Sequence, residues 1–332
     1  MGKGVILAAL LGFALAAYLI FYVGIGSVLA AIAAVGWGGF AILCLYGAAL
    51  FVLLGSAWFA LVPSFARPHL GTFVWGRAVR DCASEILPFS QVGGMVIGVR
   101  AMMLRHVSGS LAFASTVVDV TVETIAQIAF VLAGLAVLLS RAPHSPSSRV
   151  LVDSLAIALA VATAGVAFFL LLQRRSLEIL ERWVTRVLPQ AASQAVAVRR
   201  SIADIHASPL RLVVSLTIHL ASWLATVGWA WIALRLIGRP LAFSSVLAIE
   251  AILYAIRSIS FVVPSAIGVQ EAAYAILGPL FGLPAPVAVA VSLLKRARDI
   301  VLGVPVLFAW QATEGGRALR ASRAAARCMA DE

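Results

Sequence analysis

The chain has 332 residues, of which 62% are hydrophobic and 12% are charged, and its formal net charge is +11. A soluble domain is usually about 45–50% apolar and about 25% charged, so these values exclude a water-soluble fold and indicate an integral membrane protein. In such a protein the basic excess fits loops that face anionic lipid headgroups, and we expect no nucleic-acid partner.

Apolar segments recur along the whole chain. A helix needs about 20 such residues to cross the roughly 30 Å hydrocarbon layer. The first run has this length and no A-x-A cleavage site, so we expect a span rather than a signal peptide. The sequence therefore predicts an all-α, polytopic membrane bundle of about eight spans in a single domain at 1–310. The segments lie at 4–23, 37–62 (joined to the first by Gly/Ala-rich 24–36), 111–140, 150–173, 210–237, 242–256, an interrupted 258–282 and 285–310.

Two long polar connections, 63–110 and 174–209, separate these runs. The second alternates charged residues with Leu, Ile, Trp and Val at helical spacing, which predicts an amphipathic helix on the cytoplasmic membrane surface. Seventeen of the 25 Lys and Arg residues fall in the N-terminus, at 63–110, at 174–211 and in the basic tail at 311–332, against four in the opposite loops. This split predicts that both termini are cytoplasmic. Residues 258–282 either cross the bilayer or dip into it and return.

Two stretches interrupt apolar sequence in the same way. "SEILPFSQVGGMVIG" at 84–98 and "SFVVPSAIGVQEAAYAI" at 260–276 each run from apolar residues through Pro to Gly and back. Proline removes a backbone N–H and disfavours helix before it, whereas glycine permits unusual backbone geometry. In lipid, such backbone must be buried in protein or line a watery cavity. Broken helices in two halves of a chain are typical of a transporter site, although two ordinary kinked helices would also fit. The predicted helix breaks are Pro88, Gly93, Gly94, Pro264 and Gly268.

Charged residues inside the apolar segments form stripes at helical spacing. Each costs about 2.5–3.5 kcal/mol at the centre of a membrane helix, so we expect them to face the protein interior. Each residue is either a substrate contact or a member of a buried salt bridge, and the "KRAR" sequence at 295–298 would alternatively snorkel at a helix end. We expect Glu271 to pair with a base in the last span. The stripes are Thr116, Asp119, Glu123 and Gln127; Glu250, Tyr254 and Arg257; and Lys295, Arg298 and Asp299.

No catalytic or cofactor motif is recognisable. The three cysteines and five histidines are scattered without disulfide or metal spacing, and we interpret His219 as a packed, hydrogen-bonded histidine. The sequence contains no G-x-x-x-x-G-K-[ST] loop and no G-x-S-x-G elbow. We therefore expect no cofactor, no metal, no direct use of ATP and no enzymatic activity, while noting that Asp119 and Glu123 have the chemistry of an acid and a base.

Three short motifs carry a family resemblance. These are "LPFSQVGG" at 87–94, "VPSAIGVQE" at 263–271 and "KRARD" at 295–299. They resemble the transmembrane, flippase-like region of the lysylphosphatidylglycerol synthase family, and "LPFSQVGG" is most similar to the branch found with hopanoid biosynthesis. The resemblance covers nearly the whole chain. It implies a protein that moves a lipid between leaflets or membranes, or that binds and presents it.

The chain also departs from the pattern of that family. Gly93-Gly94 lack the Glu that commonly follows the first motif, although Arg100 is near, and "VDVTVE" stands where many members carry Glu-Arg. Headgroup selectivity therefore cannot be transferred. The aminoacyl-transferring domain of the synthases is a separate soluble module, and we find no such segment in this sequence.

The sequence thus predicts a lipid flippase, transporter or lipid-binding protein in the bacterial cytoplasmic membrane. Its expected partners are membrane lipids, hopanoid-related or anionic, and enzymes of lipid biosynthesis. The alternatives are an intramembrane lipid-modifying transferase and a non-catalytic partner of such enzymes. The residues predicted to bind lipid are Gln91, Arg100, Asp119, Glu123, Glu250, Arg257, Gln270, Glu271 and Arg298.

Overall fold

The structure is a computed structural model that describes residues 25–64, 68–86, 90–141, 192–259, 266 and 268–330, with isolated positions 157 and 160. Within these residues every regular element is a helix, which confirms the predicted all-α class. The helices are α2 (Ile25–Leu61), α3 (Leu70–Ile86), α4 (Ser90–Met103), α5 (Gly109–Arg141), α7 (Ala192–His206), α8 (Pro209–Leu236), α9 (Phe243–Ile259), α10 (Val269–Leu280) and α11 (Ala285–Ala330).

Three of the described helices are long and apolar enough to cross a bilayer. They lie within α2, α5 and α8 and match the runs predicted at 37–62, 111–140 and 210–237. Large apolar side chains on them face outward, including Leu45 with 72% of its surface exposed. An exposed apolar surface of this kind is what lipid requires of a membrane span. The runs predicted at 4–23 and 150–173, and most of the amphipathic segment before α7, lie outside the described residues.

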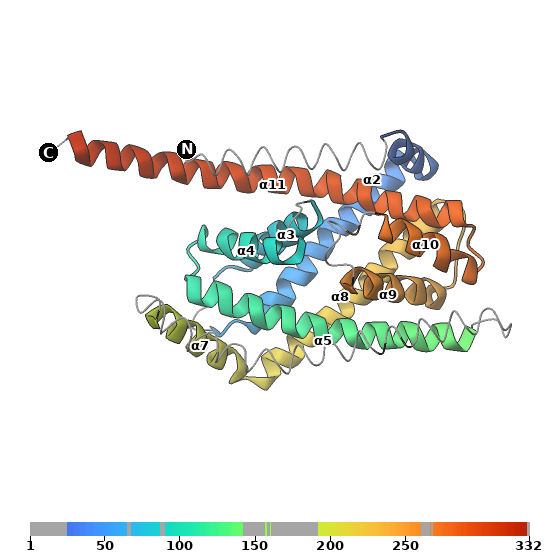
Figure 1. Cartoon of the computed structure of the whole chain (residues 1–332), viewed down its shortest axis with the longest axis horizontal. Helices are drawn as coiled ribbons and strands as arrows, with labels where there is room; N and C mark the ends of the chain where they lie inside the picture. The colour runs from blue at the N-terminus through green and yellow to red at the C-terminus, as the bar shows by residue number, and fades with distance from the viewer. Residues whose placement is uncertain are drawn as a thin grey trace.

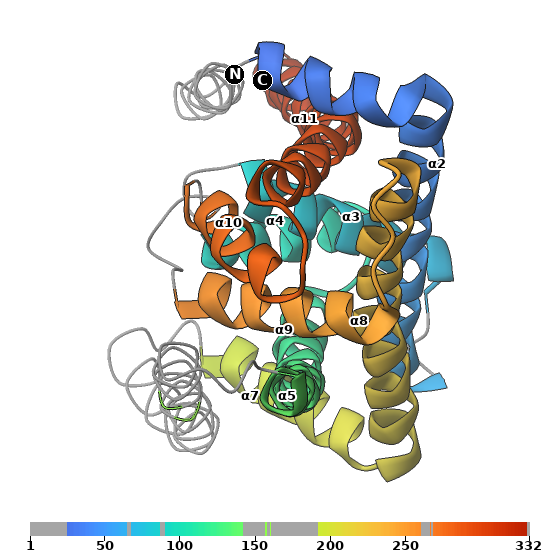
Figure 2. The same ribbon diagram turned by 90° about the vertical axis from the view of Figure 1, so that its right-hand side faces the viewer.

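The first and the last of the described helices extend beyond the predicted runs. α2 begins at Ile25, and its axis turns at Gly36, where φ is 77° and ψ is 154° (Figure 2). Glycine adopts this conformation without the steric cost that a side chain would impose. α11 continues through the predicted tail as far as Ala330. Its 46 residues span about 69 Å at 1.5 Å per residue, far more than a bilayer core.

Residues 63–110 are not a simple polar connection, because they contain α3 and α4. These two short helices run antiparallel: Gly94 lies against Ser84, and Gly98 lies against Arg80. α3 looks hydrophilic in sequence, yet Arg77 and Arg80 are 4% and 5% exposed. The loop count of basic residues therefore included two interior arginines. Without these two arginines, the distribution of Lys and Arg between the two sides still predicts cytoplasmic termini.

The interrupted segments are helical hairpins. α9 ends at Ile259 and α10 starts after Gly268, whose φ of 78° confirms the predicted break there. Residues 250 and 257 of α9 contact residues 274 and 270 of α10, so the two helices run antiparallel and the chain returns toward the side from which it came. Pro88 and Pro264 lie outside the described residues, in the gaps between paired helices.

Gly93 and Gly94 are not helix breaks, because both lie inside α4. A Cβ at Gly94 would stand 1.9 Å from Ser84 Oγ and 2.6 Å from the Arg80 carbonyl oxygen. Glycine is therefore needed here for the close approach of α4 to α3 rather than for unusual backbone angles.

The helices form two sets with the same order. In each set a long helix (α2 or α8) is followed by a hairpin of short helices (α3–α4 or α9–α10) and then by another long helix (α5 or α11). α3 packs on α11 of the other set, and α9 packs on α5 in the matching way. α5 and α11 lie on opposite sides of the four short helices (Figures 1 and 2).

The two sets have opposite orientations, because α2 and α8 pack antiparallel. Trp229 Nε1 donates to the Leu43 carbonyl at 2.9 Å, and the Tyr46 hydroxyl donates to the Ala225 carbonyl at 2.8 Å. Residue numbers rise along one helix as they fall along the other. Equivalent helices that cross in opposite directions define an inverted repeat, an arrangement found in many transporters.

Close packing of α2 on α3 provides a test of this architecture. A Cβ added at Gly55 would lie 2.6 Å from the Cα of Val74, whereas nothing lies within 4 Å of one added at Gly38 on the same helix. We expect Gly55→Ala to lower the free energy of unfolding by about 1–3 kcal/mol through overpacking. Gly38→Ala should raise it by up to about 1 kcal/mol through helix propensity. Thermal unfolding in detergent would measure both, and equal midpoints would contradict the packing of α2 on α3.

Candidate functional site

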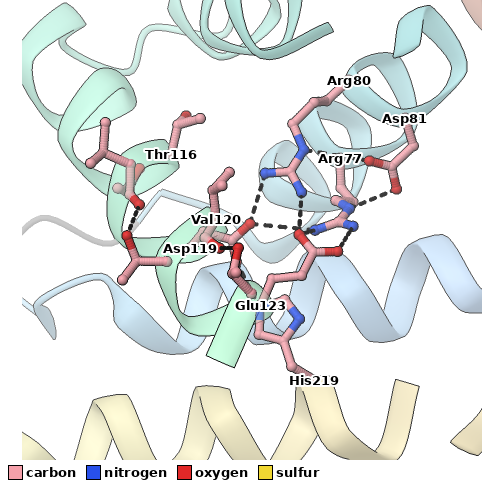
Figure 3. A network of polar contacts seen from close by, with 12 residues as sticks. Arg77, Arg80, Asp81, Thr116, Asp119, Val120, Glu123 and His219 are labelled. Carbon is pink, nitrogen blue, oxygen red and sulfur yellow. Dashed lines mark hydrogen bonds and ion pairs between the residues drawn. The ribbon is translucent and has the colours of Figure 1, made fainter. Parts of the chain in front are cut away.

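A cluster of buried charge joins α3, α5 and α8 (Figure 3). Arg77, Arg80 and Asp81 occupy one face of α3, and Asp119 and Glu123 are one helical turn apart on α5. Asp119 and His219 have no exposed surface. We call this set the α3–α5 cluster; its members are Arg77, Arg80, Asp81, Asp119, Glu123 and His219.

Both arginines of the α3–α5 cluster hold both carboxylates of α5. Two guanidinium nitrogens of Arg77 donate to the two carboxylate oxygens of Glu123, at 2.8 and 2.5 Å. Arg80 divides its donors between Asp119 at 2.8 Å and Glu123 at 2.7 Å. Arg77 Nε also donates to Asp81 at 2.6 Å. Such charge-assisted, forked contacts are among the strongest polar interactions in proteins, so this cluster links α3 to α5.

A second buried set, the α9–α11 cluster, consists of Glu250, Lys295 and Tyr274. One Glu250 oxygen accepts from the Lys295 ammonium, and the other accepts from the Tyr274 hydroxyl. The ammonium also lies 5.3 Å from the ring centroids of both Tyr254 and Tyr274. Lys295 is 1% exposed and Glu250 is fully buried. All of the polar groups in this cluster therefore have partners inside the protein.

The two clusters occupy equivalent places with their charges exchanged. Arg77 is the eighth residue of α3 and Glu250 is the eighth of α9, counting from Leu70 and Phe243. Asp119 and Lys295 are each the eleventh residue of α5 and α11. The cation on the short helix in one half therefore corresponds to an anion in the other.

A third set, the hairpin-break cluster, connects the ends of the two hairpins. Arg257 of α9 donates to Glu85 of α3 at 2.5 Å and to Gln270 of α10 at 2.9 Å. Gln270 donates to Ser292 of α11 at 2.8 Å, and Ser292 donates to Glu271 at 2.9 Å. The Glu85 side chain is 27% exposed and Arg257 is 14% exposed, whereas Gln270, Ser292 and Arg296 are buried. The members are Glu85, Arg257, Gln270, Glu271, Ser292 and Arg296.

Glu271 has two roles at the start of α10. One carboxylate oxygen accepts from the Gly268 N–H at 2.9 Å, so the side chain caps its own helix. The other oxygen lies 3.3 Å from Arg296 Nε. This contact confirms the prediction that Glu271 pairs with a base of the last span. Arg296 also donates to the Ala266 carbonyl at 3.1 Å, which satisfies backbone next to the break.

Other predicted lipid-binding residues lie apart from these clusters. Arg298 pairs with the adjacent Asp299 at 2.7 Å and lies 4.6 Å from the Trp229 ring centroid. Arg100 pairs with Glu314 at 2.7 Å and is 47% exposed. Gln91 lies on α4, but its side chain is outside the described part.

The residues of one predicted stripe do not all bond to the same partner. On α5, Thr116 donates to the Ala112 carbonyl of its own helix, whereas Gln127 donates to Ser258 of α9 at 2.8 Å. The alternative that "KRAR" snorkels at a helix end is wrong, because Lys295 and Arg296 are 1% and 5% exposed in the interior of α11.

Several site residues were missed in the sequence, because Arg77, Arg80 and Glu85 were assigned to a polar connection. The interpretation of His219 as a packed, hydrogen-bonded histidine is confirmed, but its contact with the charge of α5 was not predicted. The helical spacing of Arg77, Arg80, Ser84 and Glu85 was the available signal, because it places polar groups along one face. His219 offered no local signal, since its partner Asp119 lies 100 residues away.

The α9–α11 cluster allows a double-mutant test. Glu250→Gln keeps an acceptor for Tyr274 but leaves Lys295 buried without its counter-charge, and Lys295→Met leaves the carboxylate alone. We expect each single change to cost about 3–5 kcal/mol of unfolding free energy. The double variant should cost much less than the sum, because it removes both charges. Chemical denaturation of the four proteins would measure the coupling, and additive effects would show that the pair does not interact.

The comparison with known proteins agrees with this architecture. No curated protein and no solved structure is detectably similar to the chain. The family model described as "Lysylphosphatidylglycerol synthase TM region" matches residues 9–306, which is most of the chain and includes all three clusters. The protein therefore belongs to the lysylphosphatidylglycerol synthase transmembrane region family, a family of membrane proteins associated with lipids.

Proposed function

We propose that the protein moves a lipid with a polar headgroup between the two leaflets of a membrane, and that the headgroup passes the hairpin-break cluster. The observation that carries this proposal is the Glu85–Arg257 pair, which joins the two broken hairpins while both side chains keep some exposure. Interrupted helices that meet between inverted repeats are where transporters bind their substrates. The family's association with membrane lipids supports the same conclusion.

The chemistry of this pair suggests the class of cargo. A guanidinium binds phosphate with two parallel hydrogen bonds, so Arg257 suits an anionic phosphodiester. Gln270 and Glu85 add an amide and a carboxylate that suit the hydroxyl or amino groups of a headgroup. We propose an anionic phospholipid or a hopanoid-linked lipid as cargo. The membrane would be the bacterial cytoplasmic membrane, with both termini in the cytoplasm.

Transport fits the geometry better than the transferase alternative. Asp119 and Glu123 would be the acid and base of such an enzyme, but each accepts hydrogen bonds from at least one arginine. A carboxylate held by a guanidinium is stabilised in its ionised form and is a poor proton carrier. We therefore propose a non-enzymatic role. Mass spectrometry of lipids incubated with the protein would reveal a new covalent product if the transferase alternative held.

Leaflet exchange in proteoliposomes tests the proposal. Purified protein should accelerate the movement of a fluorescent phosphatidylglycerol between leaflets, measured as the fraction of dye that an added reductant bleaches. Arg257→Gln should slow exchange about tenfold, the equivalent of about 1.4 kcal/mol lost from headgroup binding. Arg200→Gln, which removes an exposed arginine of α7, is the matched control and should leave the rate unchanged.

The outcomes separate the hypotheses. Equal exchange with and without protein would overturn the transport proposal. A scaffolding partner of lipid enzymes should tolerate Arg257→Gln if it still folds, so unfolding must be monitored alongside. Hopanoid-containing and hopanoid-free vesicles, compared in the same assay, would show whether the cargo is hopanoid-related.

A further inference from the structure

The interior charges of the described bundle do not balance. Seven carboxylates and six cationic side chains take part in the ion pairs of the three clusters and of Arg298. With His219 neutral, this set carries one excess negative charge, which is costly to the extent that its carboxylates are buried: Asp119 is fully buried, whereas the Asp81 and Glu123 side chains are 25% and 20% exposed. The acids are Asp81, Glu85, Asp119, Glu123, Glu250, Glu271 and Asp299; the bases are Arg77, Arg80, Arg257, Lys295, Arg296 and Arg298.

The excess lies in the α3–α5 cluster. Glu250 with Lys295, Glu85 with Arg257, Glu271 with Arg296 and Asp299 with Arg298 each match one acid to one base. In the α3–α5 cluster, by contrast, three carboxylates share two arginines. The equivalent cluster of the other half, in which Glu250 pairs with Lys295, is neutral and provides a reference within the same protein. One further positive charge would balance the set.

His219 is placed to provide that charge. Its ring is fully buried, and Nε2 lies 3.1 Å from Asp119 Oδ1. Because an ionised carboxylate only accepts hydrogen bonds, Nε2 must carry a hydrogen and Nδ1 holds the lone pair in the neutral ring. Nδ1 is buried and has no partner among the described residues. Figure 3 shows the ring beneath Asp119 and Glu123.

The surrounding helices place other charged and titratable groups near α8. α3 contributes Arg77 and Arg80 and α5 contributes Asp119 and Glu123 to the same cluster. Elsewhere along α8, Tyr46 of α2 donates to the Ala225 carbonyl, and Arg211 of α8 donates to the Asp204 carbonyl of α7. Tyr254 of α9 meets α8 through Trp223, and His206 of α7 contacts the Ile202 carbonyl of its own helix.

We propose that His219 and Asp119 form a binding site for one exchangeable proton and, as a step that rests on the proposed function, that lipid movement is coupled to its binding and release. A proton from water binds the Nδ1 lone pair, while Nε2–H keeps its hydrogen bond to Asp119. The product is an imidazolium, and the interior set becomes neutral. Release returns the same proton to water and breaks no other bond. Histidine is suited to this exchange because its charge changes near neutral pH.

Proton binding can be measured without any transport assay. Nitrogen NMR of histidine-labelled full-length protein in lipid nanodiscs reports the protonation of each ring nitrogen, and His219→Gln assigns the signal. We expect Nδ1 of His219 to gain a proton on acidification while Nε2 stays protonated. In Asp119→Asn the cluster is neutral without the added proton, so the His219 ring should stay neutral where the wild-type ring is protonated. A wild-type ring that keeps one state from pH 5 to pH 9 would overturn the proposal.

Coupling requires a second measurement in proteoliposomes with and without a pH gradient. In the wild type the gradient should increase phosphatidylglycerol exchange severalfold. In His219→Gln the ratio of the two rates should fall to about one, while His206→Gln, an exposed histidine of α7, should keep the wild-type ratio. An unchanged ratio in His219→Gln would reject the coupling. If no protein-dependent exchange occurs, the proposed function fails, whereas a titrating His219 would still establish the proton site.

Discussion

The fold depends on the requirement that ionised side chains surrounded by hydrocarbon have partners. Apolar faces do not select one helix over another in lipid, because acyl chains solvate them equally well. The ion pairs are specific: Arg77 and Arg80 link α3 to α5, and Lys295 links α11 to α9. The Glu85–Arg257 pair then joins the two hairpins. The same residues that make insertion costly therefore link α3 to α5 and α9 to α11, which do not pack closely on one another.

The inverted repeat keeps this geometry while changing its chemistry. Arg77 and Glu250 are equivalent positions with opposite charge, as are Asp119 and Lys295. The charges of the two halves therefore do not compete for the same partners, because Arg77 would be repelled by Lys295, the residue that replaces Asp119 in the other half. The two halves also differ because the α3–α5 cluster contains a histidine, His219, whereas the α9–α11 cluster does not.

The sequence predicted the membrane class, the break at Gly268 and the pairing of Glu271, because hydropathy and local helix chemistry determine them. It could not predict that α3 is buried, since Arg77 and Arg80 make a helix look hydrophilic until their partners more than 35 residues away are known. Gly94 was misassigned for a related reason. A glycine that permits a close contact and a glycine that breaks a helix look alike until the neighbouring helix is placed.

The relative cost of opening each cluster indicates where the bundle can move. Separating a fully buried pair such as Glu250 and Lys295 costs about 3–5 kcal/mol, whereas exposed pairs contribute about 0.2–1 kcal/mol. Glu85 and Arg257 fall between these limits, because both side chains are partly exposed. A conformer that is populated at 0.1–10% lies only a few kcal/mol above the ground state. The interior charges therefore oppose a motion that parts the hairpins at this pair less than one that separates Glu250 from Lys295.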